Sequence, residues 1–175
     1  MKIIFLDIDG VLNNELWFVE SVGKLKDSSD KREWEVSHFD PRCVGLLNGI
    51  TDFTGARIVV SSSWRIGRSL DDLIDLLEDA GVTGGIIDRT PRLHFTGVED
   101  YDYSVPRGNE IKCWMELNKD LLGQSIGKYD DYVILDDDSD MLYWQRNNFF
   151  WCDPYVGLTN NLAHKVKMFL GKAAR

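Results

Sequence analysis

Short apolar runs alternate along the chain with longer stretches in which apolar residues recur every three or four positions. Short runs rich in β-branched residues are typical of strands buried on both faces of a parallel sheet. The longer stretches have the period of helices that bury one side. The pattern predicts strands at 3–6, 56–60, 85–88, 132–135 and 149–153.

The predicted helices lie between these strands. The clearest begins at Asp40-Pro41, which supplies an N-cap and a proline at the first helical position, and ends at Gly55. Its apolar stripe is Val44, Leu47 and Ile50, with Phe53 as a further candidate. The other predicted helices are 69–80, 107–121, 141–146 and one that follows Thr159.

Strands that alternate with helices predict an α/β fold, here a Rossmann-like three-layer sandwich with a central parallel sheet of about five strands. No repeat, low-complexity tract or linker interrupts the 175 residues, so residues 1–175 are expected to form a single domain. Residues 13–40 keep neither period for long, and this small insert is predicted to be an exposed flap or hairpin.

Composition narrows the function. A net charge of −9 argues against a broad nucleic-acid-binding face, although it allows a local basic pocket. No apolar stretch approaches a membrane span, and the first run is too short for a signal peptide. The three cysteines lie far apart in the sequence, which favours reduced thiols in a cytoplasmic protein. Nothing fixes the oligomeric state, and a monomer is assumed.

Carboxylates follow two of the predicted strands. Asp7 and Asp9 come directly after the first, where open α/β sheets bind ligands, and Gly10 lets the chain turn away. Carboxylates this close repel each other unless a cation lies between them, and a hard cation such as Mg²⁺ takes oxygen ligands. Asp136 and Asp137 repeat this arrangement after the fourth strand. The alternative is a pair of solvated acidic turns.

Anion ligands are predicted beside these acids. Ser61 and Ser62 follow the second strand and precede Arg65, which suits a phosphate oxygen, although the serines could instead cap a helix. Arg107 opens a helix, where a cation opposes the macrodipole, so an anion-binding role explains it better than helix stabilisation does. Lys112 is the second candidate, and a surface cation is the alternative for both.

These residues carry a family resemblance. Asp7-Ile8-Asp9-Gly10-Val11, Ser61, Arg107 or Lys112, and Asp136-Asp137 resemble the four ordered motifs of the haloacid dehalogenase-like (HAD) phosphohydrolases. Further segments resemble the HAD domains of Swiss Army Knife RNA repair proteins, so that the resemblance covers most of the chain. They are Phe39-Asp40-Pro41, Ser61-Ser62-Ser63-Trp64-Arg65, Thr90-Pro91, Arg107-Gly108-Asn109-Glu110-Ile111, 134–141 and Gly157-Leu158-Thr159.

The resemblance implies a role for each residue of the reaction. Asp7 would be the nucleophile that becomes an aspartyl-phosphate, and Asp9 the general acid and then the base. Ser61 would hold a phosphoryl oxygen. Arg107, or failing that Lys112, would neutralise the phosphoryl group.

The resemblance also implies a Mg²⁺ site. Asp136 would bind the ion together with Asp7 and the backbone carbonyl of Asp9. Asp137 would orient the metal shell through water, although Asp140 could take its place. The expected function is therefore Mg²⁺-dependent hydrolysis of a phosphate monoester.

The flap is too short for a folded cap domain, which typically needs about 50 residues or more. An open site favours a substrate that covers the phosphate with its own surface, so a polynucleotide end or a nucleotide is expected. A small-molecule phosphatase and a non-catalytic phosphate- or metal-binding repair accessory remain alternatives. The candidates to stack on bases or hold phosphates are Trp17, Trp34, Tyr101, Tyr103, Arg65, Arg68, Arg89, Arg92 and Arg107. For the aromatic residues, packing within the flap or the core is the alternative.

Overall fold

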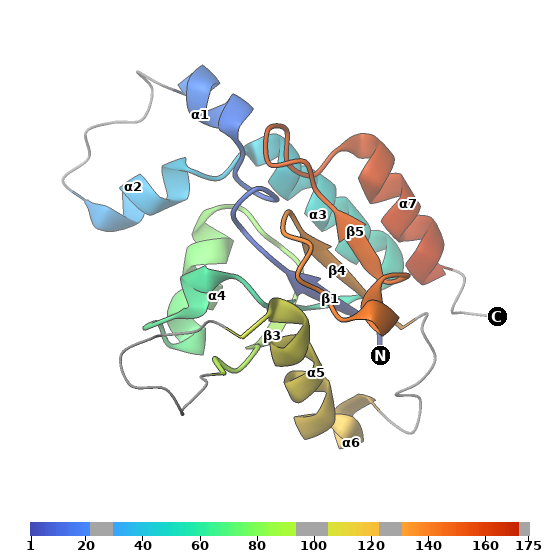
Figure 1. The fold of residues 1–175 in the computed structure, drawn as a ribbon. Coiled ribbons are helices and arrows are strands. Elements are labelled where there is room, and N and C mark those ends of the chain that lie inside the picture. The colour runs from blue at the N-terminus through green and yellow to red at the C-terminus, as the bar shows by residue number, and fades with distance from the viewer. Residues whose placement is uncertain (22–29, 94–104, 123–130, 172–175) are drawn as a thin grey trace.

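The computed structural model describes residues 1–21, 30–93, 105–122 and 131–171. Its centre is a five-stranded parallel sheet with the order β3-β2-β1-β4-β5 (Figure 1). The strands are β1 (Ile3–Leu6), β2 (Arg57–Val60), β3 (Ile86–Arg89), β4 (Tyr132–Asp136) and β5 (Phe149–Trp151). The predicted parallel α/β sheet is confirmed, and each strand lies within one or two residues of its expected position.

Helices cover both faces of the sheet, which completes the expected three layers (Figure 1). No helix in the described ranges is long and apolar enough to cross a membrane. The helices are α1 (Glu15–Ser21), α2 (Lys31–Ser37), α3 (Pro41–Thr54), α4 (Leu70–Asp79), α5 (Arg107–Leu117), α6 (Lys119–Leu122) and α7 (Asn160–Gly171), with 3₁₀ turns η1 (Ser63–Arg65) and η2 (Tyr143–Gln145).

Alternate residues of each strand supply the two halves of the core. Ile4 and Leu6 of β1 are fully buried against the layer of α3, α4 and α7. Phe5 belongs to the opposite cluster, where its ring meets that of Trp114 on α5 edge to face at 5.4 Å. Because successive side chains of a strand point to opposite faces, a central strand that is apolar throughout fills both halves.

The capping prediction is confirmed for α3, and α4 is capped as well. The Asp40 carboxylate accepts a hydrogen bond from the Arg42 amide, and Gly55 ends α3 in the left-handed conformation at φ 68°. Ser69 caps α4 through a reciprocal pair of hydrogen bonds with Asp72. One member of the predicted α3 stripe is wrong, because Phe53 is 60% exposed on the outer side of the helix.

The flap contains helices, whereas the sequence predicted an exposed flap or hairpin. Its described parts fold as α1 and α2, and residues 22–29 lie outside the described residues. The indole N–H of Trp17 on α1 donates to the carbonyl of Ser37 at the end of α2, which joins the two helices. Arg68 pairs with Glu35 at 2.6 Å and holds α2 beside α4.

The helix predicted at 141–146 is also wrong, because this stretch forms only the 3₁₀ turn η2. The Gln145 side chain accepts from the amide of Leu142 and donates to the carbonyl of Gly108. The segment is thereby tied to the start of α5, and the chain enters β5 at Phe149, so there is no room for further turns.

Candidate active site

Three polar side chains occupy equivalent positions at the carboxyl edge of the sheet. Leu6 is in register with Val60 on one side and Leu135 on the other, so the residues that follow them, Asp7, Ser61 and Asp136, lie side by side. The Asp7 amide donates to the Leu135 carbonyl and the Ser61 amide to the Leu6 carbonyl, at 2.9 and 2.8 Å. The hydrogen-bond ladder of the sheet therefore sets the spacing of the site.

Asp7, Asp136 and Asp137 form a carboxylate cluster in which one oxygen of each lies within 4.8 Å of the other two. Burial, together with the charge of Asp7, raises the pKa of Asp136 to about 8. Burial and Asp7 also raise the pKa of Asp137. Three carboxyl groups this close suit a hard cation, which would offset their repulsion.

The cluster also contains an atom without a protein partner. Asp136 is completely buried, and its Oδ2 has no hydrogen bond within the described part of the chain. A buried carboxylate oxygen of this kind is costly unless a ligand completes its shell. The cluster therefore fits Mg²⁺, whose preferred ligands are oxygens.

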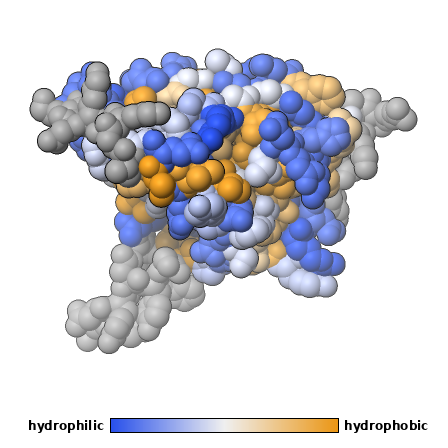
Figure 2. Space-filling model, turned by 90° about the horizontal axis from the view of Figure 1, so that it is seen from above, coloured by the Kyte–Doolittle hydropathy of each residue, from blue (hydrophilic) through white to orange (hydrophobic). Residues whose placement is uncertain are grey.

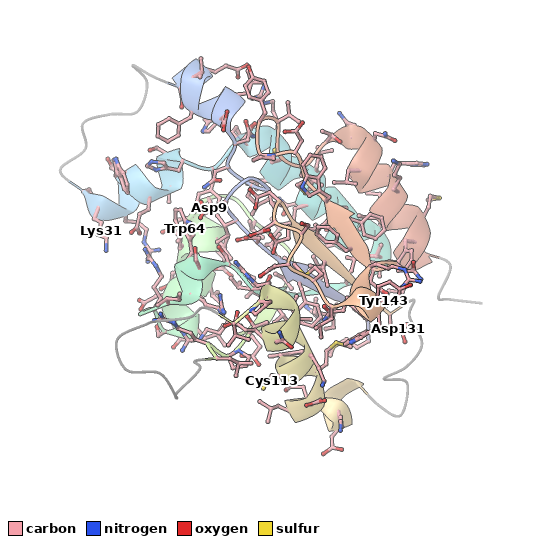
Figure 3. All side chains as sticks on the ribbon, in the orientation of Figure 1. Asp9, Lys31, Trp64, Cys113, Asp131 and Tyr143 are labelled. Atoms are coloured by element: carbon pink, nitrogen blue, oxygen red, sulfur yellow. The ribbon has the colours of Figure 1, made fainter. Side chains whose placement is uncertain are left out.

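Asp9 lies apart from the cluster and is exposed. The indole N–H of Trp64 donates to both carboxylate oxygens at 3.0 and 2.9 Å, and Asn13 donates to one of them at 2.8 Å. Figure 3 shows the Asp9 and Trp64 side chains close together. The contact of Trp64 with Asp9 was not predicted, because no spacing rule relates residues so far apart in sequence.

The structure brings Arg107, and not Lys112, to the cluster. Arg107 Nη2 lies 3.5 Å from Asp7 Oδ2, and its Nη1 is buried with no hydrogen bond to any described residue. Lys112 is half exposed and pairs with Glu116, one turn further along α5. Arg107 therefore has a guanidinium nitrogen free to meet an anion next to Asp7.

Asp140 lies outside the carboxylate cluster and has a different contact. Its Oδ2 accepts a hydrogen bond from the backbone N–H of Arg107 at 2.7 Å. Asp140 thereby satisfies one of the amides at the start of α5 that have no partner within the helix. Asp137, by contrast, lies within the cluster. The two acids that the sequence left as alternatives are thus placed in different environments.

The two predicted serines also differ. Ser61 is completely buried, and its Oγ has no hydrogen-bond partner in the described ranges. Ser62 is buried too, but its Oγ accepts from the amide of Trp64 and caps η1. Ser61 is therefore the serine that retains a donor for a bound group.

Arg65 has no N–H group left to donate to a bound anion. It is 5% exposed, and its guanidinium donates to the carbonyls of Ser61, Ser62, Thr90 and Pro91 and to the Glu110 carboxylate. These contacts use all five N–H groups of the side chain. Arg65 thus holds the ends of β2 and β3 and α5 together beneath the site.

The aromatic and basic residues expected near the site have mixed positions. Trp17 is engaged within the flap, whereas Trp34 is 49% exposed and packs against His38. Arg68 pairs with Glu35, and Arg89 donates to the carbonyls of Arg65 and Arg68. Arg92 lines a separate hollow beside β3. Tyr101 and Tyr103 lie outside the described residues.

Comparison with known proteins agrees with the fold. The family model for the HAD domain in Swiss Army Knife RNA repair proteins matches residues 3–163. No curated protein and no solved structure matches the chain significantly. The match covers most of the sequence, so the chain belongs to this family, and the resemblance drawn from its motifs is confirmed.

Proposed function

We propose that this HAD domain is a Mg²⁺-dependent phosphomonoester hydrolase that acts through an aspartyl-phosphate on a nucleic-acid phosphate end or a nucleotide. The observation that carries the proposal is a set of unsatisfied buried groups beside Asp7. The Ser61 hydroxyl, Arg107 Nη1 and Asp136 Oδ2 have no partners among the described residues. A phosphoryl group would take hydrogen bonds from the first two, and a cation would complete the third.

The metal would be held by carboxylates of Asp7 and Asp136, with Asp137 acting through water and Asp9 through its backbone carbonyl. The clustered acids support this assignment. When bound, Mg²⁺ would polarise the phosphoryl group and neutralise charge that builds up as the leaving group departs. Asp140, which serves the start of α5, is left out of this set.

Asp7 would supply the nucleophilic oxygen. The Ile8 amide donates to Asp7 Oδ1 at 2.6 Å, and Arg107 lies beside Oδ2, so both carboxylate oxygens are oriented. One of them would form a bond to phosphorus while the ester bond from phosphorus to the leaving alcohol breaks. Ser61 and Arg107 would hold the transferred phosphoryl oxygens through this step.

Asp9 would transfer the protons. It would give a proton to the leaving oxygen and then accept one from the water that hydrolyses the aspartyl-phosphate, which restores Asp7. Trp64 and Asn13 donate to the Asp9 carboxylate and hold it in position.

The substrate assignment rests on the small flap and on the family description, which names RNA repair. Helices α1 and α2 are too small to enclose a substrate. A polynucleotide end would cover the open site with its own surface, and the net charge of −9 confines any attraction for phosphates to local contacts.

Phosphate release from end-phosphorylated oligonucleotides and matching mononucleotides tests this function. We expect release that requires Mg²⁺ and stops on chelation, with a higher kcat/KM for the oligonucleotide that falls as salt increases. An equal or higher kcat/KM for the mononucleotide, unchanged by salt, would point to a small-molecule phosphatase. If no phosphate monoester is hydrolysed, the remaining interpretation is a non-catalytic accessory module.

Magnesium is expected to stabilise the protein more at high pH than at low pH. Burial raises the pKa of Asp136 to about 8 in the metal-free folded protein, whereas the ordinary pKa of this carboxyl group, which applies to the unfolded chain, is 3.8. Between these two pH values the folded protein retains a proton that the unfolded chain has lost. Stability of the metal-free protein therefore falls as pH rises through this window, and the loss is complete above about pH 8. Mg²⁺ requires the ionised carboxylate and reverses that loss.

Thermal unfolding with and without millimolar Mg²⁺ measures this effect. We expect an increase in Tm of several degrees at pH 8 and a smaller one at pH 5.5. Asp136→Asn, which cannot ionise, should respond weakly at both. An equal Mg²⁺ response at the two pH values would contradict the assignment of Asp136 as a ligand.

A further inference from the structure

A pocket of about 520 Å³ lies directly beside Asp9. Asp9, Gly10 and Asn13 form the end nearest the carboxylate cluster, and the flap, η1 and the loop after β5 supply the rest. Its wall residues are Asn14, Glu15, Phe18, Val19, His38, Trp64 and Pro154. Under the proposed function, on which this inference depends, the leaving group must lie on this side, because Asp9 protonates the leaving oxygen.

The pocket presents mostly apolar surface. Phe18 and Val19 on α1 are 47% and 68% exposed, although both are large apolar side chains. Figure 2, which views the molecule from the side that carries α1, shows apolar residues exposed among polar ones. Trp64 also lines the pocket and is partly exposed, so it can contact a ligand, although the Arg68 guanidinium lies over its ring, 5.8 Å from the centroid.

The charges of the pocket disfavour a further phosphate within it. Its residues include the acids Asp9 and Glu15 and neither lysine nor arginine. A second phosphate within it would meet negative charge without a cation to offset it. The occupant must therefore carry no negative charge, and the volume is that of a drug-sized ligand, larger than a single phenol ring needs.

His38 adds one polar contact to this wall. Its Nδ1 lies 2.7 Å from the Trp34 carbonyl, and because a carbonyl only accepts, the proton must be on Nδ1. The ring also packs against Phe18 and Trp34, at centroid distances of 5.4 and 4.2 Å. Nε2 has no hydrogen bond to any described residue, so it is available as an acceptor for a hydroxyl or amino group.

We propose that this pocket binds the neutral nucleoside of the leaving group, with Phe18 and Trp64 packing on the base and His38 Nε2 accepting a hydrogen bond from it. A nucleoside combines the features that the pocket selects: a flat apolar ring, polar edges and no negative charge. For a polynucleotide substrate, only the terminal nucleoside enters, and the next phosphate lies outside.

The test compares adenosine 5′-monophosphate with ribose 5-phosphate, which has the same leaving oxygen and no base. We expect a kcat/KM about tenfold or more higher for the nucleotide in the wild type. Phe18→Ala should abolish this preference by lowering the kcat/KM for the nucleotide. Tyr143→Ala is the control, because this aromatic residue is 80% exposed and lies away from Asp9 and Trp64 (Figure 3).

Equal kcat/KM values for the two substrates would overturn the inference, as would a Phe18→Ala variant that slows both equally. A higher kcat/KM for O-phosphotyrosine than for the nucleotide would overturn the inference, because the pocket would then bind a tyrosine side chain and not a nucleoside. Calorimetric binding of adenosine separates this inference from the proposed function, because it needs no catalysis. If no phosphate ester is hydrolysed, millimolar adenosine binding that Phe18→Ala weakens supports the pocket, and absence of binding overturns it.

Discussion

Asp7→Asn is expected to reduce phosphate release to background, a loss of at least about ten-thousand-fold, comparable to removal of other enzyme nucleophiles. An amide cannot form the aspartyl-phosphate, although it has nearly the same shape as the carboxylate. Steady-state release of inorganic phosphate from an aryl phosphate measures the loss. Mass spectrometry of acid-quenched protein should find a phosphoryl adduct on the wild type and none on the variant.

Asp9→Asn is the matched control, because it removes a neighbouring carboxylate with a different assigned role. This variant should still become phosphorylated by an aryl phosphate, whose leaving group needs little proton transfer, while turnover slows by about a hundredfold. Wild-type activity in Asp7→Asn would show that Asp7 is not the nucleophile. Wild-type turnover of an alkyl phosphate by Asp9→Asn would remove the acid–base role.

Gly10→Ala is expected to lower Mg²⁺ affinity by at least about tenfold and activity with it. Gly10 has a φ of 66°, which disfavours side chains, and an added Cβ would overlap the Asp137 carboxylate. Asp137 would have to leave the carboxylate cluster. Titration of Mg²⁺ against activity and against Tm measures the loss.

Gly45→Ala provides the comparison for this substitution. Gly45 lies on the exposed side of α3, and an added Cβ would meet no atom within 4 Å. This helical position should gain about 0.5–1 kcal/mol of stability with unchanged Mg²⁺ affinity. If Gly10→Ala bound Mg²⁺ as tightly as Gly45→Ala does, the role of Asp137 in the metal shell would be wrong.

The fold could be predicted where local signals agree with packing. The limits of α3 follow from Asp40, Pro41 and Gly55, whose backbone preferences act over a few residues. The flap could not be predicted in this way, because α1 and α2 are short and depend on contacts such as that of Trp17 with Ser37. Isolated helices of seven residues are unstable without such packing.

The candidate site could likewise be predicted from the sequence only in part. Side chains at strand ends, such as Asp7 and Asp136, could be placed together because neighbouring parallel strands end at one edge. Arg65 could not be distinguished from a ligand, since its partner Glu110 lies on α5, far along the chain. Sequence spacing likewise could not decide whether Arg107 or Lys112 is the cation beside Asp7. The structure places Arg107 next to Asp7 and pairs Lys112 with Glu116 one turn away.

The register of the central strands has a consequence for how this domain tolerates changes in length. Asp7, Ser61 and Asp136 are aligned by backbone pairing, so one residue inserted within β1, β2 or β4 would displace a group by about 3.3 Å and turn its side chain to the other face. Insertions in the connections would leave the alignment unchanged. The loops at this edge can therefore vary in length, while the lengths of the three strands stay constrained.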